Sequence, residues 1–224
     1  MAVSLFLSTL IPILIFVPFG ILIKNGTFNI SKLYSSFIIG GIGWSVYSIL
    51  AFIPYYYIFT ESSEESYMQT IAENKTLLFF MLIFLSIVSE VVRFEFYKSP
   101  IFPEKSIKYT IVFGAGWGVA EFLGRFIFFF DSDMDQYLPS ISLLLFFVMI
   151  SNAGLTTILI RSSENTKYVM FAAFVKFFVE IAFFGAFGND LGFEDRYSRL
   201  GFFFLIQIIM FYLTMKTRKI IESE

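Results

Sequence analysis

The first candidates for chemistry in this sequence are ionisable side chains inside otherwise apolar stretches. They form pairs of opposite charge at helical spacing: Glu90 with Arg93, Glu121 with Arg125, and Lys176 with Glu180. Residues three or four apart lie on one face of an α-helix and can neutralise each other. A lone charge at bilayer depth costs about 3 kcal/mol or more. We interpret each pair as an internal ion pair, and a polar cavity or ion path lined by the same residues is the alternative.

The residue types that are missing limit the chemistry open to these groups. The chain of 224 residues contains no histidine and no cysteine. A thiolate nucleophile, a thiolate metal ligand and the usual neutral-pH acid–base are therefore excluded. An aspartyl protease needs two carboxylates that share a proton, whereas the aspartates here fall in polar loops. We expect no catalytic residue, no metal site and no cofactor.

The segments that would position these pairs are apolar and long. The chain is 57% hydrophobic and 15% charged, with a mean hydropathy of +0.77, which is typical of an integral membrane protein. About 20 apolar residues cross a hydrocarbon core about 30 Å thick. We predict an all-α integral membrane protein, a single seven-transmembrane-helix bundle over residues 1–224. The predicted spans are Val3–Ile23, Leu33–Phe59, Thr76–Tyr97, Ile107–Phe130, Leu138–Ile160, Tyr168–Phe187 and Ser198–Met215.

The loops between these spans alternate in charge. Those after the first, third and fifth spans, with the C-terminal tail, hold most of the lysines and arginines, whereas the other loops are rich in acidic residues. Cytoplasmic loops carry the excess of positive charge. We therefore expect a lumenal or extracellular N-terminus and a cytoplasmic C-terminus. The net charge of −2 gives no indication of a nucleic-acid partner.

A stripe of small and charged residues marks the fourth predicted span. Gly114 and Gly118 form a G-x-x-x-G pattern, and Glu121 and Arg125 continue the same face. Such glycines let a second helix approach closely. We predict that this stripe is a helix-contact face, and the spacing does not decide whether the second helix belongs to this chain or to a partner.

Two of these stretches resemble the anterior-pharynx-defective (Aph) family, the scaffold subunit of γ-secretase. The motif Glu-Val-x-Arg-Phe-x-x-Tyr-Lys at residues 90–98 is similar to a family stretch at the end of the third span, and Gly114 and Gly118 resemble its glycine-zipper helix. The chain departs from the family pattern at Phe122, where a third glycine would be expected. It also lacks the family's two intramembrane histidines: Thr156 stands at the position resembling the first, and the second falls near residues 178–180.

The resemblance implies a noncatalytic role. Its expected partners are a presenilin-like aspartyl protease, a nicastrin-like glycoprotein and a presenilin-enhancer-like subunit. The complex would cleave type I membrane proteins, as in Notch signalling, in the endoplasmic reticulum, Golgi and plasma membrane. The alternatives are a polar-cavity channel or transporter, or a degenerate relative of intramembrane CAAX-type metalloproteases.

Overall fold

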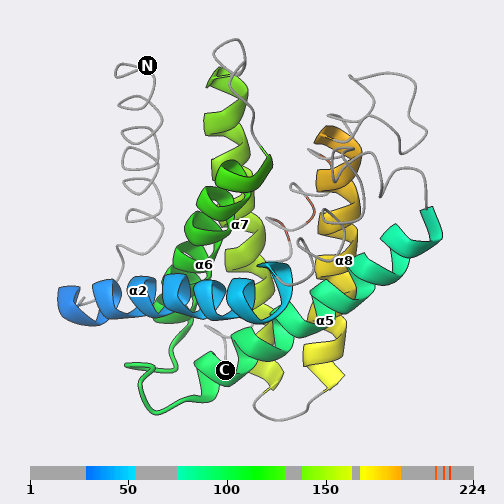
Figure 1. Ribbon diagram of the computed structural model, residues 1–224. Helices are drawn as coiled ribbons and strands as arrows, with labels where there is room; N and C mark the ends of the chain where they lie inside the picture. The colour runs from blue at the N-terminus through cyan, green and yellow to red at the C-terminus, as the bar shows by residue number, and fades with distance from the viewer. Residues whose placement is uncertain are drawn as a thin grey trace.

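The computed structural model describes residues 29–53, 75–129, 138–162 and 167–187, together with Leu205, Ile209 and Tyr212. All regular structure in these parts is helical, so the all-α class is confirmed (Figure 1). The elements are α2 (Ile30–Tyr47), a π-helical continuation η1 (Ser48–Phe52), α5 (Lys75–Lys98), α6 (Ile107–Phe129), α7 (Leu138–Ser162) and α8 (Lys167–Phe187).

The helix ends agree closely with the predicted spans. The spans predicted for the third to the sixth helix coincide with α5, α6, α7 and α8 to within two residues at each end. The second helix, α2, begins at Ile30, three residues before the predicted start at Leu33. The Asn29 side chain caps it there by accepting a hydrogen bond from the Lys32 backbone N–H at 3.3 Å. The first predicted span lies outside the described residues, and so does the seventh except for three helical residues.

One described helical segment, Ile30–Ala51, is long and apolar enough to cross a membrane by length and composition. A shorter apolar segment is Val148–Ile160 in α7. The other described helices do not meet the same criterion. The number of seven spans therefore stays a prediction.

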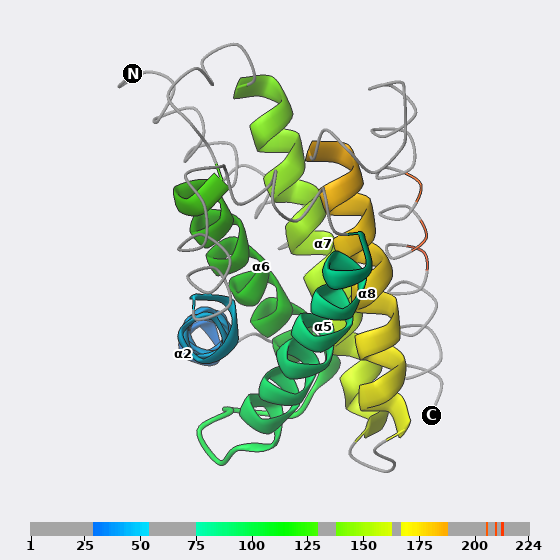
Figure 2. The same ribbon diagram turned by 45° about the vertical axis from the view of Figure 1, so that its right-hand side comes forward.

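The described helices are not all parallel. Helices α6, α7 and α8 run side by side, and α5 leans across them, whereas α2 lies crosswise against α6 (Figure 1). In Figure 2 α2 is seen almost end-on while α6, α7 and α8 still run along the view. The structure thus differs from a simple bundle of aligned helices at α2.

Glycines explain how α2 can cross α6 so closely. A Cβ atom on Gly40 of α2 would collide with the Phe113 carbonyl of α6, and one on Gly116 of α6 would collide with the Phe37 carbonyl of α2. The two backbones are therefore in direct contact on both sides of the crossing. Such contact is possible only where side chains are missing, so the glycines fix where the helices cross.

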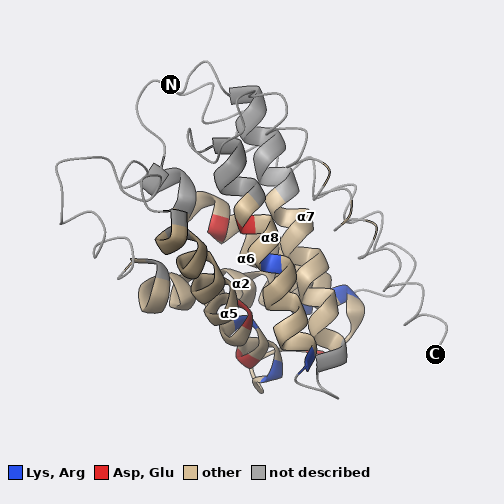
Figure 3. Cartoon of the chain, turned by 90° about the vertical axis from the view of Figure 1, so that its right-hand side faces the viewer, with Lys and Arg blue, Asp and Glu red and all other residues tan. Residues whose placement is uncertain are grey.

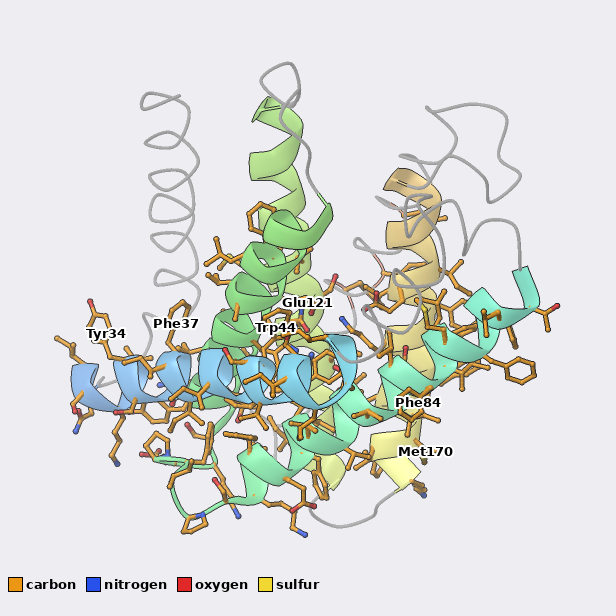
Figure 4. All side chains as sticks on the ribbon, in the orientation of Figure 1. Tyr34, Phe37, Trp44, Phe84, Glu121 and Met170 are labelled. Atoms are coloured by element: carbon orange, nitrogen blue, oxygen red, sulfur yellow. The ribbon has the colours of Figure 1, made fainter. Side chains whose placement is uncertain are left out.

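Apolar side chains cover much of the outside of the described helices. Phe80 is 64% exposed, Ile30 67% and Leu50 64%. Phe84 and Met170 lie on the outside of α5 and α8, whereas Glu121 lies among the helices (Figure 4). The interior combines aromatic packing around Trp117 with buried charged residues. Many exposed large apolar side chains together with buried charged ones are unusual for a water-soluble domain.

Candidate functional site

A buried contact between charged side chains joins α6 to α8. The Lys176 ammonium donates a hydrogen bond to Glu121 Oε1 at 2.6 Å and lies 2.8 Å from Glu180 Oε1. All three side chains are at most 6% exposed. The pair that the sequence predicts within α8, Lys176 with Glu180, is thus present, and a carboxylate from a second helix joins it.

Asn152 of α7 connects this group to α5. Its side-chain amide donates to Glu121 Oε2 at 2.9 Å and to the Val148 carbonyl at 2.8 Å. Its side-chain oxygen accepts a hydrogen bond from Arg93 Nη2. One uncharged side chain therefore links an acidic residue of α6 to a basic residue of α5.

Glu90 and Arg93 form the α5 end of the network. Arg93 Nη1 lies 3.3 Å from Glu90 Oε1, and both side chains are fully buried. The guanidinium also lies over the Trp117 ring, with 4.6 Å between Cζ and the ring centroid. A cation over an indole face is stabilised by the ring quadrupole. The predicted Glu90–Arg93 pair therefore has support from α6 and from α7 as well.

Taken together, these six residues form one buried chain of contacts across four helices, which we call the polar core. Its members alternate in charge along the chain of contacts: Glu90, Arg93, Asn152, Glu121, Lys176 and Glu180. Charged positions lie on helices in the middle of the molecule, among uncharged segments (Figure 3). Because each carboxylate is next to a cation, each partner reduces the cost of burying the other.

For the predicted Glu121–Arg125 pair, the structure describes only the Glu121 side chain. Arg125 lies in α6, but its side chain is outside the described residues. Glu121 contacts Lys176 and Asn152, two partners on other helices. The sequence could not reveal this, because spacing within one helix does not tell which helices meet.

The face of α6 that carries Gly114 and Gly118 packs against α7 of the same chain. A Cβ on Gly114 would lie 2.5 Å from Thr156 Oγ1 and 2.6 Å from the Asn152 carbonyl oxygen. A Cβ on Gly118 would lie 2.8 Å from Met149 Cα. Real Cβ atoms do not approach so closely. The spacing left the second helix undecided, and on this face of the structure it is α7 of the same chain.

Thr156, the position that resembles a family histidine, is buried beside the polar core. Its hydroxyl donates to the Asn152 carbonyl at 2.6 Å. Threonine hydroxyls in helices commonly bond the carbonyl four residues earlier. Thr156 therefore satisfies its own polar group while it packs against Gly114.

Sequence reasoning missed Asn152 as a functional residue. The signal was a single amide in the apolar run of the fifth predicted span. A buried amide needs hydrogen-bond partners, so such a residue indicates polar neighbours on other helices.

The chemistry open to the polar core is limited by these contacts. Among the described residues, no group of three or more potential ligands is placed to hold a metal ion. The Lys176 ammonium contacts both Glu121 and Glu180, so these two carboxylates share one cation. What the geometry can do is hold α5, α6, α7 and α8 in one register.

Comparison with family models, with curated proteins and with solved structures finds no match to this chain.

Proposed function

We propose that this chain is a multi-pass integral membrane protein that crosses the bilayer seven times, with its C-terminus in the cytoplasm. The observation that carries the proposal is the combination of many exposed large apolar side chains with charged residues buried in the interior. Lipid tails accept apolar side chains, whereas charges in a bilayer must face the protein interior. A mean hydropathy of +0.77 supports the same proposal.

Within the membrane we propose a noncatalytic role, that of a scaffold subunit in a γ-secretase-like complex. The polar core supports this proposal because its carboxylates are engaged by Lys176, Asn152 and Arg93. The absence of histidine and cysteine from the sequence removes the thiolate nucleophile and the imidazole acid–base. The proposed partners are a presenilin-like protease, a nicastrin-like glycoprotein and a presenilin-enhancer-like subunit, in the endoplasmic reticulum, Golgi and plasma membrane.

Purification of the tagged chain from its source cells in a mild detergent tests the scaffold role. Mass spectrometry should identify a presenilin-like and a nicastrin-like subunit in near-stoichiometric amounts, with an unrelated tagged membrane protein as the control. Recovery of the chain alone, in detergent that keeps it folded, would contradict the proposal.

Reconstitution of the purified chain tests the alternatives of transport and hydrolysis. We expect liposomes that contain only this chain to show no ion flux and no cleavage of membrane-embedded peptides. A flux or a cleavage rate that Glu121→Gln abolishes would overturn the noncatalytic role, because it would assign the activity to the polar core.

A further inference from the structure

The inner face of α5 carries buried polar atoms that have no hydrogen-bond partner among the described residues. Ser86 Oγ, Ser89 Oγ, both Glu90 carboxylate oxygens and Nε and Nη1 of Arg93 have no hydrogen bond with any described residue. These residues recur at helical spacing and are at most 1% exposed. Across from them, the Trp117 indole N–H also lacks a hydrogen bond within the described part of the chain.

Leaving these atoms dry would be costly. A buried donor or acceptor without a partner costs about 1–3 kcal/mol, and more when it is charged. The Glu90–Arg93 contact of 3.3 Å is an ion pair that leaves most of the hydrogen-bonding capacity of both groups unused. Several such atoms on one face therefore indicate a bound molecule that supplies the missing hydrogen bonds.

The chemistry of the unpaired atoms selects the ligand. The carboxylate of Glu90 offers only acceptors, Arg93 and Trp117 offer only donors, and the serine hydroxyls offer both. A metal cation would serve the acceptors and face the Arg93 guanidinium, and an anion would face Glu90. Water both donates and accepts, and buried waters typically make about three hydrogen bonds to such groups.

We propose that the inner face of α5, formed by Ser86, Ser89, Glu90 and Arg93 with the Trp117 indole, binds ordered internal water. The hydrated site lies at the α5 end of the polar core. At the other end the Lys176 ammonium binds Glu121 and Glu180 directly. In this proposal, water bridges the charged groups of the polar core where α5 meets Trp117. Where α6 meets α8, the charged groups contact each other directly.

Hydroxyl-radical footprinting of the full chain in lipid nanodiscs tests this inference. Radicals generated from a bound water oxidise the nearest reactive side chain, and Trp117 is fully buried, with its ring centroid 4.6 Å from Arg93 Cζ. We expect Trp117 to be oxidised despite its burial. After rapid mixing with ¹⁸O-labelled water, Trp117 should incorporate the label more slowly than exposed residues do, because a bound water exchanges slowly with the solvent.

Matched variants assign the water to this face. The double variant Ser86→Ala and Ser89→Ala should lower Trp117 oxidation about fivefold or more, because it removes two of the groups that hold the water. Thr110→Val is the control, since the Thr110 hydroxyl is also buried but donates to the Ser106 carbonyl at 2.7 Å; it should leave Trp117 oxidation unchanged.

Two results would overturn the inference. One is no oxidation of Trp117 in the wild-type chain, which decides the matter even if the double variant does not fold. The other is equal oxidation in the wild type and in a folded double variant.

Discussion

At the scale of single residues, Asn152 connects the two halves of the polar core. Its side chain forms hydrogen bonds with Arg93 of α5 and with Glu121 of α6 at the same time. Its amide supplies one acceptor to Arg93 and one donor to Glu121, so both charges gain a hydrogen bond at no cost in net charge. A leucine of similar size could supply neither.

Replacing Asn152 tests this linking role. We expect Asn152→Leu to lower the free energy of unfolding by about 3 kcal/mol, since hydrogen bonds to two buried charged groups are lost. The measurement is reversible unfolding in mixed detergent micelles. Thr156→Val, one turn further along α7, is the control and should cost less than about 1 kcal/mol because Thr156 bonds only a carbonyl of its own helix. Equal losses in the two variants would argue against the linking role.

What the sequence revealed at this scale depends on whether two partners share a helix. Glu90 with Arg93 and Lys176 with Glu180 are three and four residues apart, so helical geometry alone predicts their contact. The contact between Lys176 and Glu121 joins positions on α8 and α6. No local spacing encodes it, because it depends on which helices the fold brings together.

At the scale of the helices, glycines set the two closest approaches of α6. Gly114 and Gly118 face α7, whereas Gly116, two residues from each, faces α2. Successive residues two apart lie on different sides of a helix. A single short stretch of α6 therefore receives a helix on each side.

Neighbouring glycines of α2 provide a matched test of the α2–α6 crossing. A Cβ at Gly40 would collide with the Phe113 carbonyl, whereas one at Gly41 would stay 3.9 Å from the Gly116 carbonyl oxygen. We expect Gly40→Ala to destabilise the fold by about 1–3 kcal/mol through overpacking against backbone. Gly41→Ala should be neutral or should stabilise by up to about 1 kcal/mol through higher helix propensity. The free energy of unfolding measures both, and a Gly40→Ala variant as stable as Gly41→Ala would exclude the close crossing.

The helix ends were readable from the sequence, whereas the direction of α2 was not. Polar and charged residues interrupt each apolar run near the observed ends of α5 to α8. A G-x-x-x-G pattern indicates close approach without giving the crossing direction or the partner. For that reason the sequence predicts a contact face at Gly114 and Gly118 without its occupant, and the structure places α7 there.

At the scale of the whole molecule, the structure brings together loops that the charge pattern assigns to one side. Lys32 at the start of α2 and Glu104 in the α5–α6 connection form a contact of 2.8 Å. The end of α7 and the start of α8 lie toward the same end of the molecule as that connection (Figure 1). This arrangement agrees with the alternation that the lysines and arginines predict.

Single-cysteine variants test the predicted orientation against a background without native thiols. In sealed vesicles that keep the outer face outward, a membrane-impermeant maleimide should modify Ser66→Cys directly. It should modify Asn25→Cys and Lys105→Cys only after permeabilisation, since these positions lie in predicted cytoplasmic loops. The unmodified wild-type chain is the control for background. Modification of Ser66→Cys and Lys105→Cys from the same side would show that α5 does not cross the bilayer.

The exposure of many apolar side chains was foreseeable in outline from composition. A chain with 57% hydrophobic residues cannot bury them all, so many must face lipid or another protein. Composition could not show that the buried charges form one connected group. That property depends on the packing of four helices around Asn152 and Glu121.

The central claim is that the buried charges of this protein compensate one another, and Lys176 tests it most directly. Lys176→Met should lower the free energy of unfolding by about 3–5 kcal/mol, because Glu121 and Glu180 lose their shared cation. Adding Glu121→Gln and Glu180→Gln to Lys176→Met should restore most of the loss, and Lys167→Met at the exposed start of α8 serves as the control. A triple variant no more stable than Lys176→Met alone would contradict the claim.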